Sequence, residues 1–206
     1  MNDGFKYNFK TICFKEKMHL KREKNNNIYL LQFYAENNRV NLYTMINLEI
    51  YNLMFTLNKD NFEKIEMHSI SSSSPTSPTS PSSQEKNVNE VNVLFIFKPF
   101  AADLGIKPKY MYVRVTEVCE PNKKTYTCVD VDYPKPEDLK NYDKVVNTLS
   151  SMVVNFESCH KINVNYIFKL ELSHSLPIYM ENIMGLIMKK VFINLKQFIE
   201  VIQQYN

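Results

Sequence analysis

Residues 177–205 read PIYMENIMGLIMKKVFINLKQFIEVIQQY, a long segment of this 206-residue chain whose apolar residues keep an unbroken helical period. One face is formed by residues three or four positions apart: Met180, Met184, Ile187, Val191, Leu195, Phe198 and Ile202. This spacing predicts an amphipathic α-helix, and Pro177 suits its first turn. Such a helix would be about 40 Å long. It is long enough to cross a small sheet, so the rest of the chain is expected to pack against it.

Length and charge restrict the class of protein. The chain fits one domain over residues 1–206, which would bury roughly 70 % of the surface exposed by the unfolded chain. Its formal charge of +3 comes from 25 basic and 22 acidic residues, a balance that argues against a nucleic-acid partner. No apolar run approaches the roughly 18 residues of a membrane span, and no apolar signal segment follows the first residue. We therefore expect a cytoplasmic protein.

Cysteine spacing predicts neither a disulfide framework nor a zinc site. Cys13, Cys119, Cys128 and Cys159 form no C-x-x-C pair, and in a cytoplasmic protein they are expected to be reduced and buried. Cys159 and His160 are adjacent, so on a strand they point to opposite faces and cannot converge. We expect no catalytic residue, no metal and no cofactor.

The first half of the chain predicts a hairpin, a helix and a strand. Residues 12–21 and 28–34 are rich in β-branched and aromatic types, with a turn between them. Residues 42–57 show helical spacing, with a possible cap at Asn41 or Asn47, and residues 62–70 form a further strand. A Ser/Thr/Pro-rich tract follows at 71–89, which we expect to be a disordered insertion because it lacks enough apolar surface. Its Ser-Pro pairs match proline-directed phosphorylation sites, although low-complexity bias in the coding sequence is the commoner explanation.

The second half alternates between apolar and polar residues and predicts an antiparallel sheet. Expected strands cover residues 91–97, 110–118, 125–132, 152–156 and 164–172. Together with the two helices, they indicate an α+β fold in which a curved antiparallel sheet wraps around the long C-terminal helix.

Three stretches resemble the steroidogenic acute regulatory protein-related lipid-transfer (START) family. They are LFIFKPFAADLGIKPKYMYVRV at 94–115, TYTCVDVDYPKPE at 125–137, and VNYIFKLELSHSLPIYMEN at 164–182. The third is the most specific, because Glu171, Pro177 and Asn182 fall on matching positions of the family's last strand and helix entry. The resemblance covers residues 91–206 well and the earlier half by order of elements.

The chain also departs from the family's pattern. It has no counterpart of the first helix and no Trp, and Phe62 stands where the family usually has that Trp. His174 replaces a turn glycine, and Asn147 replaces a basic residue. These departures affect the ligand class more than the fold.

The resemblance implies a helix-grip domain that encloses one hydrophobic lipid between the sheet and the C-terminal helix. The ligand would be a sterol, phospholipid or sphingolipid, which a monomer that touches membranes transiently would carry between them or sense. The lipid-binding residues implied are Phe95, Phe97, Tyr112, Arg114, Tyr166, Phe168, Met180, Met184, Ile187 and Val191.

Arg114 carries the polar part of this expectation, since it matches an inward-facing arginine of sterol-carrying members. A buried guanidinium needs an acceptor, and the hairpin register decides whether Asp130 or Asp132 lies across from it. The alternation is in tension with this assignment, because Met111, Val113 and Val115 form the more apolar set. The alternative is a solvated Arg114 on the outer face.

Three functions remain open from the sequence. A lipid carrier would open at a membrane surface, with Lys189, Lys190 and Lys196 near acidic head groups. A non-transferring interaction module would have a degenerate, side-chain-filled cavity instead. A helix-grip enzyme would need acid and base groups that converge inside the cavity. The volume of the interior distinguishes the first function from the second.

Overall fold

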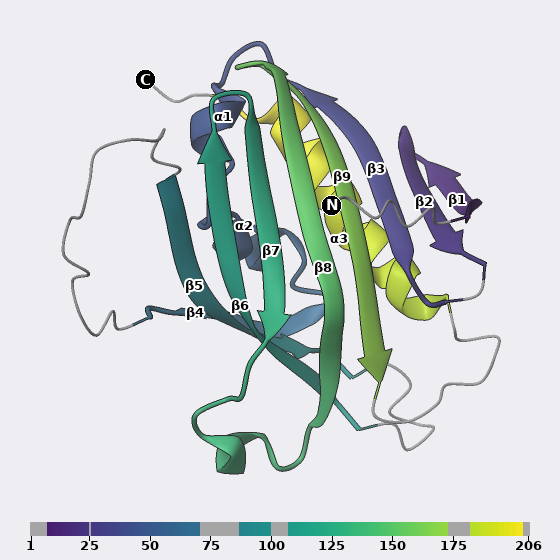
Figure 1. Ribbon diagram of the computed structural model, residues 1–206, viewed down its shortest axis with the longest axis vertical. Helices are drawn as coiled ribbons and strands as arrows, with labels where there is room; N and C mark the ends of the chain where they lie inside the picture. The colour runs from purple at the N-terminus through teal and green to yellow at the C-terminus, as the bar shows by residue number, and fades with distance from the viewer. Residues whose placement is uncertain (1–7, 25, 71–86, 100–106, 173–181, 204–206) are drawn as a thin grey trace, which may run out of the picture.

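Figure 1 shows the computed structural model of the chain, which describes residues 8–24, 26–70, 87–99, 107–172 and 182–203. Most of the expected insertion, residues 71–86, lies outside these ranges. The last three residues of the predicted insertion, 87–89, belong to the sheet instead, because strand β5 begins at Asn87. The predicted boundary at residue 89 is therefore wrong by three residues.

The described strands form one nine-stranded sheet in the order β1-β2-β3-β9-β8-β7-β6-β5-β4, with antiparallel neighbours along that order. Their bounds are β1 (Phe9–Lys15), β2 (Met18–Glu23), β3 (Tyr29–Glu36), β4 (Phe62–His68), β5 (Asn87–Phe97), β6 (Lys109–Glu120), β7 (Lys123–Asp130), β8 (Asp143–Ser158) and β9 (Lys161–Leu172). β3 pairs with β9, which joins the N-terminal strands to the C-terminal half of the sheet.

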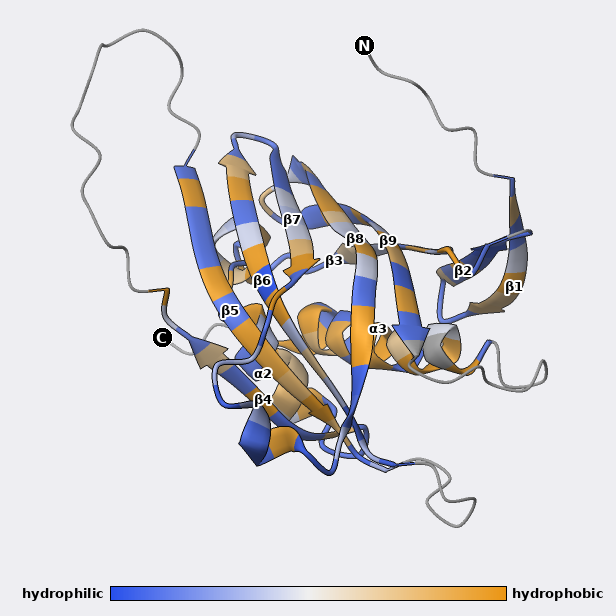
Figure 2. Ribbon diagram, turned by 60° about the horizontal axis from the view of Figure 1, so that its bottom comes forward, coloured by the Kyte–Doolittle hydropathy of each residue, from blue (hydrophilic) through white to orange (hydrophobic). Residues whose placement is uncertain are grey.

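The helices lie on the concave side of this curved sheet, as Figures 1 and 2 show. They are α1 (Leu42–Met45), α2 (Ile50–Leu57) and α3 (Ile183–Val201), and a 3₁₀ helix covers Pro136–Leu139. α3 contacts β2, β3 and α2, while α2 also contacts β4. The predicted α+β architecture, a curved antiparallel sheet around a C-terminal helix, is confirmed. In the described part of the chain, no helix has the length and apolar character needed to cross a membrane.

The first predicted strand, residues 12–21, is in fact two strands with a tight turn between them. Glu16 and Lys17 form this turn with φ values of 53° and 56°. Positive φ at both positions matches the twist of a two-residue hairpin, but this turn type normally uses Asn or Gly. Neither residue type is present, so the sequence carries no signal for the turn.

The helix predicted over residues 42–57 is interrupted. Asn41 caps α1 as expected, because its Oδ1 accepts from the backbone N–H of Tyr43 at 2.9 Å and of Thr44 at 3.3 Å. The Asn47 side chain then accepts from the Glu49 N–H at 2.8 Å. Such local side-chain bonds compete with helical backbone bonds, and α2 begins only at Ile50.

The C-terminal helix is shorter than predicted. Its 19 described residues end at Val201, which corresponds to about 28 Å. Asn37 terminates it, because its Nδ2 donates to the carbonyls of Ile199 at 2.6 Å and Ile202 at 2.8 Å. A side chain from a distant segment thus satisfies carbonyls at the helix end. Residues 177–181, predicted to begin the helix, lie outside the described ranges.

Two lysines expected to face head groups are buried instead. Lys189 is 3 % exposed and its Nζ donates to Cys13 Sγ at 2.8 Å. Lys196 is 4 % exposed and pairs with Glu200 at 2.6 Å. Lys190 is exposed, so it alone of the three lies at the surface.

The cysteine predictions hold in part. All four cysteines are free, but Cys159 is exposed and the other three are only partly buried. His160 has a local role: its Nδ1 lies 3.0 Å from the Asn37 carbonyl and 2.9 Å from the Val40 carbonyl. It holds the segment after β3 against the β8–β9 turn.

Candidate ligand-binding site

An internal cavity of about 50 Å³ lies between the concave face of the sheet, α2 and α3. Aromatic side chains form much of its wall: Tyr51, Phe62, Phe95, Phe97, Tyr126, Tyr166 and Phe192. Four methionines from four different elements also line it: Met54, Met111, Met152 and Met188. Thioether side chains adapt to irregular shapes, so this wall is both apolar and adjustable.

Three of the expected lipid-binding residues line the cavity, namely Phe95, Phe97 and Tyr166. Phe168 lies in the core beside it, where its ring stacks on Tyr166 at 4.8 Å between centroids.

The expected helix residues have other positions. Val191 is fully buried in the core but does not line the cavity, and Ile187 lines a separate surface groove with Lys98 and Lys109. Met180 and the side chain of Met184 lie outside what the structure describes.

Tyr112 and Arg114 do not line the cavity, which corrects the assignment implied by the resemblance. Val113 and Val115 are fully buried on the inner face of β6, so their neighbours point to the outer face. There the Arg114 Nε donates to Asn92 Oδ1 at 3.4 Å, and Tyr112 packs edge-on against Tyr133. The strand buries its aliphatic set, as the alternation alone indicates.

The carboxylates of Asp130, Asp132 and Glu171, which could supply an enzyme's acid and base groups, do not converge in the cavity. Asp130 pairs with Lys144 at 2.6 Å, and Glu171 pairs with Lys169 at 2.6 Å. Asp132 is exposed. None of the three lines the cavity.

Five polar side chains gather along the cavity wall: Tyr51, Cys128, Asn147, Ser150 and Tyr166. The Tyr51 hydroxyl lies 3.8 Å from Cys128 Sγ, and the Ser150 hydroxyl lies 3.3 Å from that of Tyr166. Asn147 Nδ2 donates to the Cys128 carbonyl at 3.0 Å. The sequence reasoning missed this cluster apart from Tyr166.

A β-bulge places Asn147 and Ser150 on the same face. These residues are three apart, and in a regular strand they would point to opposite faces. The register of β8 against β9 shifts between Asn147 and Leu149, which adds one residue and restores a common direction. The sequence carries one signal for the cluster: the polar Asn147 and Ser150 belong to the same inward-facing set of β8 as Val145, Met152 and Val154.

The cluster is electrically neutral at ordinary pH. Burial raises the pKa of the Tyr51 and Tyr166 hydroxyls and of the Cys128 thiol, because a low-dielectric site disfavours the anion. No Asp, Glu, Lys, Arg or His is among the described residues that line the cavity.

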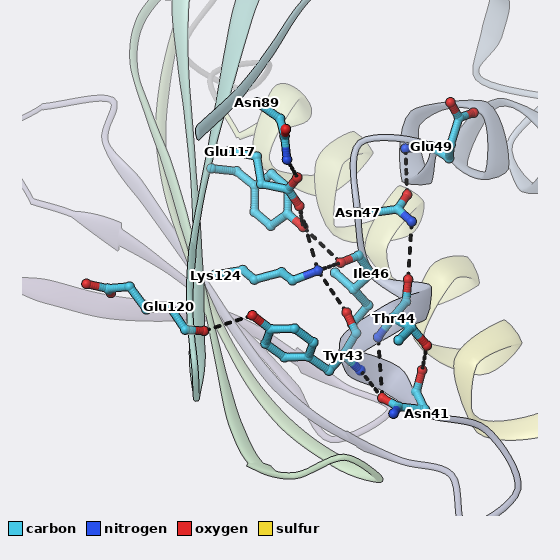
Figure 3. Close-up of polar contacts among 11 residues, drawn as sticks. Asn41, Tyr43, Thr44, Ile46, Asn47, Glu49, Asn89, Glu117, Glu120 and Lys124 are labelled. Carbon is cyan, nitrogen blue, oxygen red and sulfur yellow. Dashed lines mark hydrogen bonds and ion pairs between the residues drawn. The ribbon is translucent and has the colours of Figure 1, made fainter. Parts of the chain in front are cut away.

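A second polar network holds the C-terminal end of α1, just before α2, against the sheet (Figure 3). Lys124 Nζ donates to the carbonyls of Tyr43 at 2.8 Å and Ile46 at 2.6 Å. Glu117 lies 3.9 Å from Lys124 and accepts from the Tyr126 hydroxyl at 2.7 Å and from Asn89 at 2.9 Å. Strands β6 and β7 thus bind α1 and Ile46, the residue that caps its C-terminus.

The curved sheet, the enclosing C-terminal helix and the apolar cavity between them define a helix-grip domain. Comparison with solved structures places this fold among START domains. The human StarD13 (DLC2) lipid transfer and protein localization domain has a TM-score of 0.68 at 10 % identity, covering 95 % of this chain and 91 % of that one. Human StAR-related lipid transfer protein 5 has a TM-score of 0.69 at 14 % identity, and the match covers 93 % of this chain and 86 % of that one.

Human STARD10 gives a TM-score of 0.70 at 8 % identity, covering 93 % of this chain and 72 % of that one. Comparison with protein-family models and with curated protein sequences finds no match. The predicted helix-grip fold is confirmed, and it rests on the structure rather than on sequence identity.

Proposed function

We propose that this chain binds one hydrophobic ligand in the cavity beneath α2 and α3, as a non-enzymatic lipid-binding domain. One observation carries the proposal: the cavity is lined by aromatic and methionine side chains, with a neutral polar cluster on its wall. Ligand sites of this kind are mostly apolar with a few convergent polar groups that orient the ligand. The printed names of two similar structures, which include the words lipid transfer, support the same class.

The cavity must expand to receive a lipid. It measures about 50 Å³, whereas ligand pockets usually span roughly 300–1,000 Å³. Rotation of Met54, Met111, Met152 and Met188 offers one means, because unbranched thioethers repack readily. Displacement of α3 from the sheet offers another. Carrying lipid between membranes in the cytoplasm, with transient surface contact, extends the proposal.

The small volume also favours a second candidate function, a non-transferring interaction module with a degenerate cavity. In that case the interior stays filled and the domain acts through its surface. The two functions differ in a single property, which is uptake of a lipid.

Native mass spectrometry with lipid extraction tests the proposal, on protein purified from a eukaryotic cytosol and then incubated with liposomes. We expect one lipid per chain. Val113→Phe replaces an isopropyl group of the cavity wall with a bulky aromatic ring and should block uptake. Val129→Phe, on the exposed outer face of the neighbouring strand, is the control and should not.

Circular dichroism shows whether both variants remain folded. A wild-type chain that is empty and takes up neither sterol nor phospholipid would leave the interaction module as the function.

A further inference from the structure

The buried amide of Asn147 is only half satisfied. Asn147 is 5 % exposed and lines the cavity. Its Nδ2 donates to the Cys128 carbonyl at 3.0 Å, but no described residue donates to its Oδ1. A buried carbonyl oxygen without a donor is costly, so this atom points to a binding partner that supplies one.

The neighbouring polar groups pair with one another. Ser150 and Tyr166 lie within hydrogen-bond distance, as do Tyr51 and the Cys128 thiol. The Cys128 carbonyl accepts the Asn147 N–H, which orients the amide with its nitrogen toward β7. Asn147 Oδ1 is therefore the acceptor in this cluster that receives no hydrogen bond from a described residue.

The electrostatics of the wall restrict the partner. The described lining residues include no cation to pair with a phosphate and no anion to pair with an ammonium group. A charged head group buried there would lose its hydration and gain no ion pair in return, which makes its burial unfavourable. An uncharged hydroxyl provides one hydrogen-bond donor, its O–H, at low desolvation cost.

We propose that the ligand is an uncharged lipid whose polar end is a hydroxyl, and that this hydroxyl donates to Asn147 Oδ1. The inference rests on the proposed function and specifies its ligand class. The apolar body of the lipid lies against Met54, Met111, Met188 and Phe192. The cavity of about 50 Å³ also has room for water at this acceptor before the lipid binds, because about 10–15 Å³ suffices for one water.

Two matched lipid pairs and one charged lipid test the inference on the full chain. The pairs are cholestanol with cholestanone, and 1-hexadecanol with its methyl ether; each partner lacks the O–H donor. Phosphatidylcholine supplies a charged head group. We expect each alcohol to bind about tenfold more tightly than its partner, the effect of one buried hydrogen bond, and phosphatidylcholine to bind weakly.

The variant Asn147→Leu should abolish the preference by weakening the alcohols about tenfold while leaving the donor-free partners unchanged. Asn155→Leu is the matched control: the same substitution in the same strand, at a partly exposed position between the inward-facing Val154 and Phe156. It should keep the preference. The wild-type ratio is measured independently of whether the Asn147 variant folds.

Equal binding of alcohols and partners, or a preference for phosphatidylcholine, overturns the inference while lipid binding itself stands. Binding of none of the five lipids overturns the proposed function as well. An Asn147→Leu variant that folds and keeps the wild-type preference assigns the hydroxyl to another acceptor and overturns the role of Asn147.

Discussion

Two buried polar regions lie along the interior of this fold, and they differ in how completely they are satisfied. Around Glu117 and Lys124, which are 2 % and 5 % exposed, each charge has several partners. Around Asn147 the groups are neutral and one oxygen accepts from no described residue. Complete satisfaction indicates a structural role, whereas a leftover acceptor beside a cavity indicates a role in binding.

The regions are also linked through α2. Lys124 binds the Tyr43 and Ile46 carbonyls, and α2 carries Tyr51 and Met54 to the cavity. The charged network therefore positions part of the wall that surrounds the neutral cluster. Substitutions that separate stability from binding should sharpen this contrast.

Lys124→Met should have the largest effect on stability. It removes two bonds to the α1–α2 segment and leaves the Glu117 carboxylate buried without its cation. Removing one partner of a buried pair costs about 3–5 kcal/mol. Urea denaturation measures the change.

Lys123→Met is the control for that measurement. Its side chain is 43 % exposed and pairs with Glu120 at the surface, so the expected loss is below about 1 kcal/mol. Equal losses in the two variants would remove the distinction between a structural network and a surface pair.

Alkaline pH should destabilise the fold through both regions. Burial raises the pKa of Tyr51, Tyr126 and Tyr166, and for Tyr126 the Glu117 carboxylate raises it further. Below pH 10 these hydroxyls are protonated in both states. Above it the unfolded state loses its protons first, so stability falls by up to about 1.4 kcal/mol per tyrosine and pH unit.

Denaturation at pH 8 and pH 11, with phenolate absorbance followed in parallel, measures this loss. If these three tyrosines ionised near pH 10 in protein that stays folded, the two regions would not be as buried as the structure has them.

A matched pair of tyrosine substitutions compares the regions directly. Tyr126→Phe removes a 2.7 Å hydrogen bond to a buried carboxylate, which should cost about 1.5–3 kcal/mol. Tyr166→Phe removes a 3.3 Å contact with the Ser150 hydroxyl and should cost less than about 1.5 kcal/mol. Thermal denaturation of both variants gives the difference. The reverse order would mean that the neutral cluster, not the charged network, stabilises the interior.

Asn147→Leu should change stability least, by less than about 1 kcal/mol in the ligand-free protein. The variant loses the bond to the Cys128 carbonyl but also removes an oxygen that is buried without a donor, and these effects oppose each other. Unfolding in urea measures this change in the free energy of unfolding. A loss of several kcal/mol would show that Asn147 is a structural residue like Lys124.

Much of the fold was predictable because alternation and helical spacing reflect burial directly. The presence of each strand after residue 90, the cap at Asn41 and the C-terminal helix follow from such patterns, although β8 (Asp143–Ser158) begins well before the predicted range of 152–156. The turn at Glu16 and Lys17 did not, since those residue types rarely adopt positive φ. The end of α3 did not either, because Asn37 provides its cap from 162 residues away.

The site was less predictable. Phe95, Phe97 and Tyr166 line the cavity, and their contact with a lipid stays a prediction. Arg114 was assigned by resemblance, and the simple alternation of β6 was the better guide to its outer-face position. Asn147 was noted as a departure from the family pattern, but its place in the cavity depends on a bulge in β8.

The sequence by itself determined which segments alternate and which follow a helical period, and hence an α+β sheet closed by a C-terminal helix. These properties are local, because each residue's preference for burial repeats along its own element. Only the tertiary structure decided that Lys189 and Lys196 are buried, that Glu117 and Lys124 share one network, and that Asn147 faces the cavity. Those outcomes depend on register, on a bulge and on contacts between distant segments, which no local pattern records.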